Sequence, residues 1–209
     1  MSPKNKSNQR TLVLIDYANL KAATRYLGKK IDLKILYEHF KKDVSIKEVS
    51  LYYGTDPRDP RSYGFITWLR KTGYDVVTKE VKYIKINLKD LIYNSQTNRI
   101  FSRFNNELNA KIEEGIKIIS KENIPLYQQK CNLDIEIALD IFSGLEIYDS
   151  FILFSGDSDF ESILKTARMK GKYVTIISLR KFTAGEVIRN SDSYLNLMSL
   201  SRKLPGLLY

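Results

Sequence analysis

Short apolar runs alternate along the chain with segments whose apolar residues recur at helical spacing. The runs predict β-strands at residues 11–15, 47–53, 74–78, 151–154, 173–178 and 194–198. The segments between them predict helices at residues 20–27, 33–40, 63–71, 133–142, 160–169 and 182–189. Uninterrupted apolar strands separated by helices are typical of a parallel sheet that is covered on both faces. The pattern therefore predicts an α/β fold with three α/β/α layers and a central, mostly parallel sheet.

The alternation stops between residues 82 and 123. The first half of this segment suits either a hairpin or a short helix, and in the second half Leu108, Ile112, Ile116 and Ile119 have helical spacing. We interpret the segment as an arm inserted into one domain that spans residues 11–200. Residues 1–10 are polar and basic, so we expect a disordered arm there, and residues 201–209 form a C-terminal tail.

Charge and cysteine content narrow the function classes. The chain has 34 Lys and Arg against 24 Asp and Glu, a net charge of +10. This favours a polyanionic partner, most often nucleic acid, although solubility alone is an equally good reason for the charge. One cysteine excludes an intramolecular disulfide and suits a reducing compartment. Without a signal peptide or an apolar run of membrane-spanning length, we expect a cytoplasmic protein and no membrane partner.

Two apolar strands end on acids. Asp16 follows the run at residues 11–15, and Asp157 and Asp159 follow the run at residues 151–154. Functional groups of an open parallel sheet collect beyond the carboxyl ends of its strands, so we expect these carboxylates to converge. Converging carboxylates repel one another unless a cation lies between them. Since the chain has one His and one Cys, the ligands must be oxygens, and Mg²⁺ or Mn²⁺ is the expected ion. Turn and cap roles are the alternative for each acid.

The helix predicted at residues 133–142 carries two further acids. Asp134 opens this helix, where it serves either as the N-cap or as a site residue. Asp140 lies about 240° further around an ideal helix, so the two should not face one metal. We favour Asp134 for the site and keep Asp140 as an additional candidate. Ser158 and Glu161 match a capping box, which predicts Ser158 as the cap of the next helix.

The segments "LIDYANL", "LDIEIALD" and "ILFSGDSDF", in this order, resemble the NYN domain, a branch of the PIN-like metal-dependent ribonucleases. The closing "VIRNSDSYLNL" resembles the same family. The resemblance implies a PIN-like, Rossmann-like fold and RNA cleavage with Mg²⁺ or Mn²⁺. It gives catalytic roles to Asp16, Asn19, Asp134, Asp157 and Asp159 and also includes Asp140. The segment at residues 82–123 is not part of the family pattern, which leaves the choice of substrate open.

In this interpretation, the metal held by the acids activates a water for attack on phosphorus. Loops near the carboxyl edge supply candidate contacts to nucleic acid, which are Ser155, Arg58, Arg61, Lys130, Arg180 and Lys181. Lys82 and Lys85 alternate with Tyr83 and apolar residues, a composition that suits single-stranded RNA but equally suits an exposed hairpin. The arm is expected to hold RNA or a second subunit of a homodimer. Trp68 and His39 are interpreted as packing and surface residues.

Two other readings stay open. Another metal-dependent phosphoryl-transfer domain of the TOPRIM type also places D-x-D after a strand, but it requires a Glu after its first strand. A non-catalytic RNA-binding or adaptor domain would keep the fold without the chemistry. Metal-dependent degradation of RNA separates the second from a nuclease.

Overall fold

The computed structural model describes residues 9–86, 102–121 and 126–209. The chain divides into two compact units. Unit 1 comprises Met1–Glu80 and Asn132–Tyr209, and unit 2 comprises Val81–Cys131. Within the predicted N-terminal arm, residues 1–8 lie outside the described residues.

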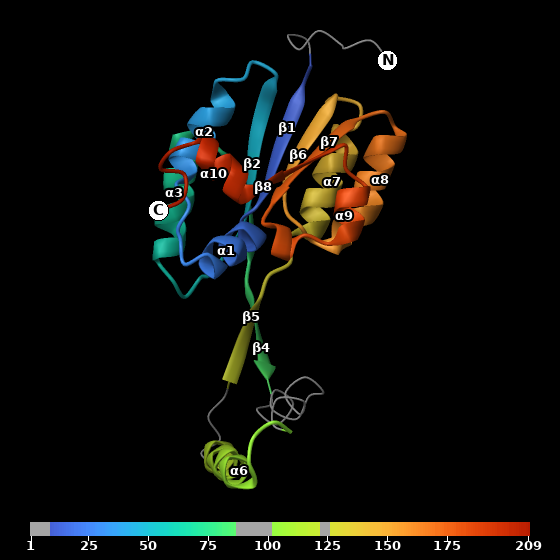
Figure 1. The fold of residues 1–209 in the computed structure, drawn as a ribbon. Coiled ribbons are helices and arrows are strands. Elements are labelled where there is room, and N and C mark those ends of the chain that lie inside the picture. Colours follow the sequence, from blue (N-terminus) through green and yellow to red (C-terminus); the bar gives the residue numbers. More distant parts are fainter. Residues whose placement is uncertain (1–8, 87–101, 122–125) are drawn as a thin grey trace. The chain divides into compact units, whose positions relative to one another are not determined.

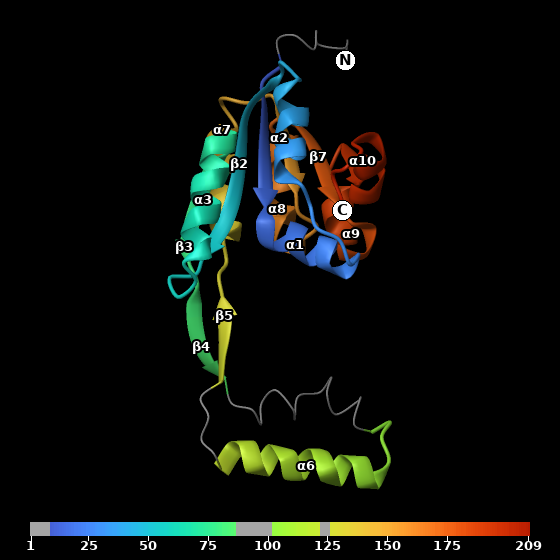
Figure 2. The ribbon, with the colours of Figure 1, turned by 90° about the vertical axis from the view of Figure 1, so that its left-hand side faces the viewer.

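Unit 1 contains a six-stranded sheet in the order β3-β2-β1-β6-β7-β8, in which β3 is labelled in Figure 2 and the other strands in Figure 1. Its strands are β1 (Thr11–Asp16), β2 (Ile46–Thr55), β3 (Asp75–Glu80), β6 (Ser150–Phe154), β7 (Tyr173–Ser178) and β8 (Ser193–Asn196). Neighbouring strands pair in parallel across the whole sheet. The predicted α/β fold with a central parallel sheet is therefore confirmed.

Helices cover both faces of the sheet (Figures 1 and 2). One face carries α1 (Tyr17–Tyr26), α2 (Leu33–Lys41), α3 (Arg61–Thr72) and α10 (Leu197–Lys203), and the other carries α7 (Asp134–Gly144), α8 (Glu161–Met169) and α9 (Gly185–Arg189). Alternate residues of one strand serve opposite cores, since Val13 and Ile15 pack toward α1 and α2, and Leu12 and Leu14 toward α7. This two-sided burial explains the uninterrupted apolar runs.

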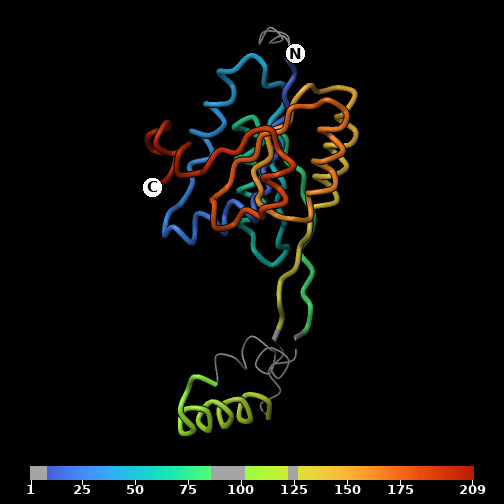
Figure 3. Tube along the Cα trace, turned by 45° about the vertical axis from the view of Figure 1, so that its right-hand side comes forward, coloured from blue at the N-terminus to red at the C-terminus, as the bar shows by residue number. Residues whose placement is uncertain are grey.

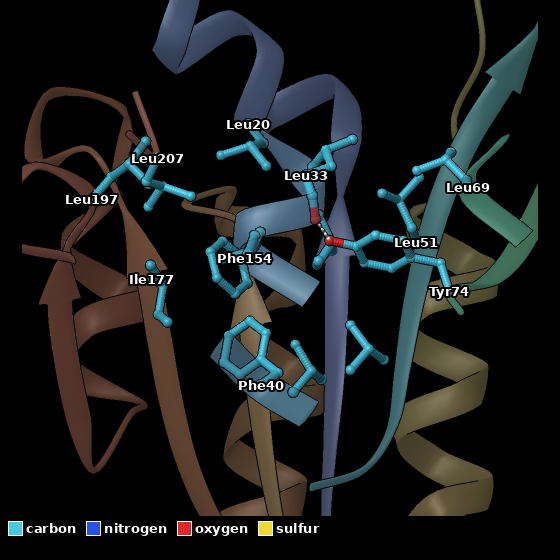
Figure 4. Packing of buried hydrophobic residues seen from close by; sticks show 14 of the residues in the cluster. Leu20, Leu33, Phe40, Leu51, Leu69, Tyr74, Phe154, Ile177, Leu197 and Leu207 are labelled. Carbon is cyan, nitrogen blue, oxygen red and sulfur yellow. Dashed lines mark hydrogen bonds between the residues drawn. The ribbon is translucent and has the colours of Figure 1, made fainter. Parts of the chain in front are cut away.

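The core around α1, α2 and α3 is drawn in Figure 4. Leu20, Leu33 and Phe40 meet the strand residues Leu51 and Phe154 there. The same core contains a buried polar contact, in which the Tyr74 hydroxyl donates to the Leu33 carbonyl at 2.6 Å. This bond satisfies a hydroxyl that burial would otherwise leave without a partner.

The C-terminal part departs from the predicted pattern at two places. The last strand ends at Asn196, whose side-chain oxygen accepts from the Met198 amide and caps α10, so residues 197 and 198 are helical rather than extended. The helix predicted at residues 182–189 is divided into the 3₁₀ turn η3 (Arg180–Phe182) and α9. The expected tail contains the end of α10 and the fully buried Leu207, so much of it packs on the core.

Unit 2 consists, in its described part, of a β-ribbon and a helix. Strands β4 (Lys82–Ile86) and β5 (Leu126–Lys130) pair antiparallel, and α6 spans Asn106–Lys121. The helix agrees with the predicted spacing, and the ribbon takes the strand alternative for residues 82–86. Residues 87–101 and 122–125 lie outside the described residues. Among the helices that the structure describes, none is both long and apolar enough to cross a bilayer.

The order of the strands creates a switch point at the centre of the sheet. From β1 the chain proceeds through α1 and α2 to β2 on one side, and from β6 it proceeds through α8 to β7 on the other (Figure 3). Strands β1 and β6 are paired neighbours, with Ile15 opposite Phe154. Because the connections diverge from these two strands, their carboxyl ends mark the place where open α/β sheets bind ligands.

Candidate active site

Asp16 stands at this switch point, as the last residue of β1 and the N-cap of α1. Its Oδ1 accepts from the Asn19 amide at 3.0 Å, and its Oδ2 accepts from the Ser155 hydroxyl at 3.1 Å. Ser155 is fully buried directly after β6, and its Oγ also accepts from the Asp157 amide at 3.3 Å. One hydroxyl therefore joins the two acidic strand ends that the sequence singles out.

Asp157 and Asp159 lie on the short turn that leads from β6 to α8. Asp157 caps the 3₁₀ turn η2 (Ser158–Phe160), because its Oδ1 accepts from the Asp159 amide at 3.1 Å. The predicted capping role of Ser158 is therefore wrong: Asp157 is the N-cap of this turn, and Ser158 is its first residue. Asp157 is half-buried, whereas Asp159 is exposed.

Gly156 lets this turn approach a neighbouring loop. A Cβ built on Gly156 would lie 2.0 Å from the Phe182 carbonyl oxygen and 2.7 Å from the Thr183 Cα. The Gly156 carbonyl also accepts from the Ala184 amide at 2.9 Å. The backbone between Ser155 and Asp157 is thus held against the loop between η3 and α9, and only glycine allows so close an approach.

Asp134 is the first residue of α7 and belongs to the same electrostatic group. Its amide donates to the Asn132 side chain at 2.8 Å, and the N-cap position of α7 is taken by Leu133, so Asp134 is not the cap. Burial raises the pKa of the Asp134 carboxyl, and the negative charges of Asp16, Asp157 and Asp159 raise it further. The carboxyl of Asp134 is therefore close enough to the other three acids for their charges to raise its pKa.

The pKa of Asp16 is also raised, chiefly by burial and additionally by the charge of Asp157, against the lowering effect of its hydrogen bonds from Asn19 and Ser155. Among the described residues, none of these four carboxylates forms an ion pair. The donor set is all oxygen, which suits a hard divalent cation. In the same described parts, however, no three acidic, His or Cys side chains are already gathered around one point as metal ligands.

Asp140 binds a tyrosine of the sheet. Its Oδ2 accepts from the Tyr52 hydroxyl at 2.7 Å, and Tyr52 is buried in β2. The carboxylate, together with burial, raises the pKa of the Tyr52 phenol. Glu136, one turn earlier in α7, pairs with Lys79 at 2.7 Å. Both acids therefore bind residues of the sheet, Asp140 the Tyr52 hydroxyl in β2 and Glu136 the Lys79 ammonium in β3.

The basic candidates fall into two groups. In unit 1, Arg61 forms a two-pronged ion pair with Asp59, Arg180 donates to the Thr183 carbonyl, and Lys181 lies 4.0 Å from the centre of the Tyr26 ring. The Arg58 amide donates to Asp56 in the same loop. The others, Lys82, Lys85 and Lys130, are exposed on the ribbon of unit 2, where Lys82 pairs directly opposite Lys130.

Unit 1 also contains a cavity of about 640 Å³, lined by Tyr17, Phe65 and Trp68 among others, which was not predicted from the sequence. It is lined by α1, by the turn after α1 and by α3. Trp68, interpreted as a packing residue, is 40% exposed on its rim. A usable signal was present in the sequence, because Tyr17, Lys21 and Arg25 recur every four residues and so share one helix face.

A family model of the NYN domain matches residues 10–95 and 83–198. The chain is also 30% identical over 189 residues to the "Low amplitude and bright protein LabA" of Synechococcus elongatus, which covers 90% of this chain and 83% of that protein. A crystal structure of a protein of unknown function from Vibrio parahaemolyticus has the same fold, with a TM-score of 0.62 and 17% identity over 93% of this chain and 96% of that one. The family model and the cyanobacterial relative show that the chain belongs to the NYN domain family, a PIN-like family of the nuclease type.

Proposed function

We propose that this protein is a metal-dependent ribonuclease that cleaves RNA phosphodiester bonds. The observation that carries the proposal is the group formed by Asp16, Asp134, Asp157 and Asp159 at the switch point of the sheet. Burial raises the pKa of Asp16 and of Asp134, and the negative charge of Asp157 raises both further. No cationic side chain is paired with any of the four carboxylates in the described structure. A divalent cation would relieve this repulsion.

The residues take separate roles in the proposal. Asp16, Asp134 and Asp157 hold the cation, Asp159 completes the ligand set, and Asn19 and Ser155 orient Asp16 through their hydrogen bonds. A bound Mg²⁺ or Mn²⁺ supplies Lewis-acid polarisation of the phosphodiester and a water of lowered pKa. The half-buried setting of Asp16 keeps bulk water from screening the charges at this point.

RNA as substrate is supported by the nuclease-type family and by the charge of the chain. The net charge of +10 remains after the acidic group is counted, so cations elsewhere on the surface outnumber acids even more strongly. The exposed Lys82, Lys85 and Lys130 add cations on the ribbon of unit 2. Membership of the NYN family sets aside the TOPRIM alternative. A non-catalytic RNA-binding domain remains the second candidate.

The test compares cleavage of a labelled single-stranded RNA in Mg²⁺, in Mn²⁺ and in EDTA. We expect cleavage with either metal and none in EDTA. Asp157→Asn keeps the shape but loses the charge, so it should abolish cleavage and leave the circular dichroism spectrum unchanged. Glu146→Gln, an exposed acid of the same unit outside the group, is the control and should cleave as the wild type does.

Two further variants assign the acids of α7. Asp134→Asn should lose cleavage, because this carboxylate is coupled to the other three. Asp140→Asn should keep most of its cleavage, because Asp140 binds Tyr52 instead. RNA binding without cleavage in every metal, for the wild type, would leave the non-catalytic alternative standing.

A further inference from the structure

We propose that the cavity lined by α1 and α3, named here the α1 cavity, binds one nucleotide. The base would lie against the aromatic wall formed by Tyr17, Phe65 and Trp68, and the phosphate at the basic rim formed by Lys21, Arg25, Lys29 and Lys30. The nucleotide belongs to the RNA strand that the neighbouring acids cut. The inference therefore rests on the proposed function and names a subsite for its substrate. All residues that line the cavity belong to unit 1.

The aromatic wall is a chain of three rings. Tyr17 and Phe65 lie with ring centroids 5.4 Å apart, and Phe65 and Trp68 are stacked at 5.9 Å with 18° between their planes. Tyr17, tilted by 44° against Phe65, and Phe65 itself are half-buried, and Trp68 at the end of this row of rings is 40% exposed. An exposed indole that stacks on a half-buried ring is a suitable platform for a base.

The rim is strongly basic. Lys21, Arg25, Lys29 and Lys30 are all exposed there, and among the described residues none of them forms an ion pair. The lining also contains the acidic side chain of Asp32, whose Oδ1 already accepts from the Lys34 and Ile35 amides as the cap of α2. A purely apolar ligand would form no favourable interaction with these four cations. A ligand that joins an aromatic ring to an anion uses both parts of this lining.

Position connects the cavity with the acidic group. Tyr17 directly follows Asp16, so their Cα atoms lie about 3.8 Å apart. The same helix α1 therefore supplies a carboxylate of the proposed active site and one wall of the cavity. The volume of about 640 Å³ falls within the range of small-molecule sites, about 300–1,000 Å³. A strand whose phosphate lies at Asp16 thus has a place for an adjoining nucleotide.

The single tryptophan makes the cavity observable by itself. Trp68 is the one Trp of the chain, so intrinsic tryptophan fluorescence reports on the cavity alone. The protein is titrated in EDTA with AMP, with ribose 5-phosphate and with a short oligouridylate. We expect saturable quenching by AMP and by the oligonucleotide, and a much smaller change with ribose 5-phosphate, which lacks the base. An unchanged emission at saturating AMP overturns the proposal.

Variants test whether the strand uses the cavity. Trp68→Ala should weaken binding of labelled oligouridylate about 5- to 100-fold, as loss of one stacked base does. Lys29→Ser with Lys30→Ser should lower the salt dependence of binding by about 1.4 units of log–log slope, from about 0.7 per phosphate contact. The matched controls are Tyr173→Ala, an exposed aromatic on β7, and Lys165→Ser with Lys170→Ser on and after α8, which should bind as the wild type does.

The outcomes separate this proposal from the proposed function. Binding is measured in EDTA and does not depend on cleavage. A protein that binds AMP at Trp68 but does not cut RNA would therefore support the α1 cavity as a nucleotide site and contradict the proposed nuclease function. If the protein cuts RNA and both cavity variants bind RNA like the wild type, the nuclease function is supported and the nucleotide site in the α1 cavity is contradicted. AMP that displaces the oligonucleotide supports the strand as the source of the nucleotide. AMP that binds together with the oligonucleotide overturns that source and leaves a site for a free nucleotide.

Discussion

The Ser155 hydroxyl donates to Asp16 Oδ2 at 3.1 Å across 139 residues of sequence. The same oxygen accepts from the Asp157 amide, so one hydroxyl forms hydrogen bonds with residues at the ends of both β1 and β6. Hydrogen bonds to a carboxylate favour its charged form and oppose the effect of burial on its pKa. The hydrogen bond from Ser155 thus opposes the rise in the pKa of Asp16 that burial causes, and it orients the carboxylate.

Ser155→Ala should weaken binding of Mn²⁺, and with it cleavage, by about 10- to 100-fold, the usual effect of losing a partner that orients a metal ligand. Isothermal titration with Mn²⁺ measures the first and RNA cleavage the second. Ser178→Ala is the matched control, since Ser178 is also buried near a strand end and its hydroxyl has no hydrogen-bond partner in the described structure. Equal Mn²⁺ affinity in the two variants would contradict the role given to Ser155.

Gly156→Ala should destabilise unit 1 by about 1–3 kcal/mol and reduce cleavage, because the new Cβ would collide with backbone that cannot turn aside. Urea unfolding followed by circular dichroism measures the first effect. Gly64→Ala on α3 is the control, since nothing lies within 4 Å of its Cβ position. That helical substitution should instead stabilise the protein by up to about 1 kcal/mol. A Gly156 variant as stable as the wild type would show that the loop after η3 can yield.

The raised pKa of Asp16 predicts how stability changes with pH. A carboxyl whose pKa is higher in the folded state binds protons more readily there than in the unfolded chain. Its contribution to stability is therefore greatest at low pH and declines as the pH rises from the ordinary Asp value through the folded-state pKa. Without metal, Asp16→Asn should gain stability relative to the wild type over this interval, measured by thermal unfolding at several pH values.

Metal should reverse this difference. Mg²⁺ or Mn²⁺ at about 100 times its Kd should stabilise the wild type by about 2.7 kcal/mol. Asp16→Asn should respond much less. A wild type whose melting temperature ignores both ions would refute a metal site at Asp16.

The ribbon of unit 2 gives a separate prediction about salt. Replacing Lys82, Lys85 and Lys130 by Ser should lower the log–log salt slope of RNA binding by about 2, at about 0.7 for each phosphate contact on a single strand. Replacing Lys111 by Ser is the control, because its ammonium already pairs with Glu107. If the ribbon instead holds a second subunit through mostly apolar contact, the slope should stay unchanged and the sedimentation behaviour should change.

The strand and helix pattern could be predicted because the central strands β1, β2, β6 and β7 have buried residues on both faces, and each helix of unit 1 packs one face against the sheet. Asp16 and Asp157 could be paired in advance because parallel strands end at one edge. The cap of η2 could not be assigned, since Ser158 and Asp157 are both good caps and the geometry of the turn decides between them. The α1 cavity escaped prediction because Phe65 and Trp68 come from a helix about fifty residues further along the chain, and their meeting with Tyr17 depends on tertiary packing.

The pairing of β1 with β6 also bears on how the protein folds. Residues 11–80 and 132–209 each form local strand pairs, and within the six-stranded sheet the pairing of β1 with β6 is the one that joins them. Unit 2 lies in the loop that must close for the pairing, yet it lengthens that loop by less than twofold, which costs less than about 0.6 kcal/mol of closure entropy. Evolution can therefore exchange or resize the arm at little cost to the core. Since Asp16 comes from one half and Asp157 from the other, a newly synthesised chain acquires its acidic group only when the two halves have joined.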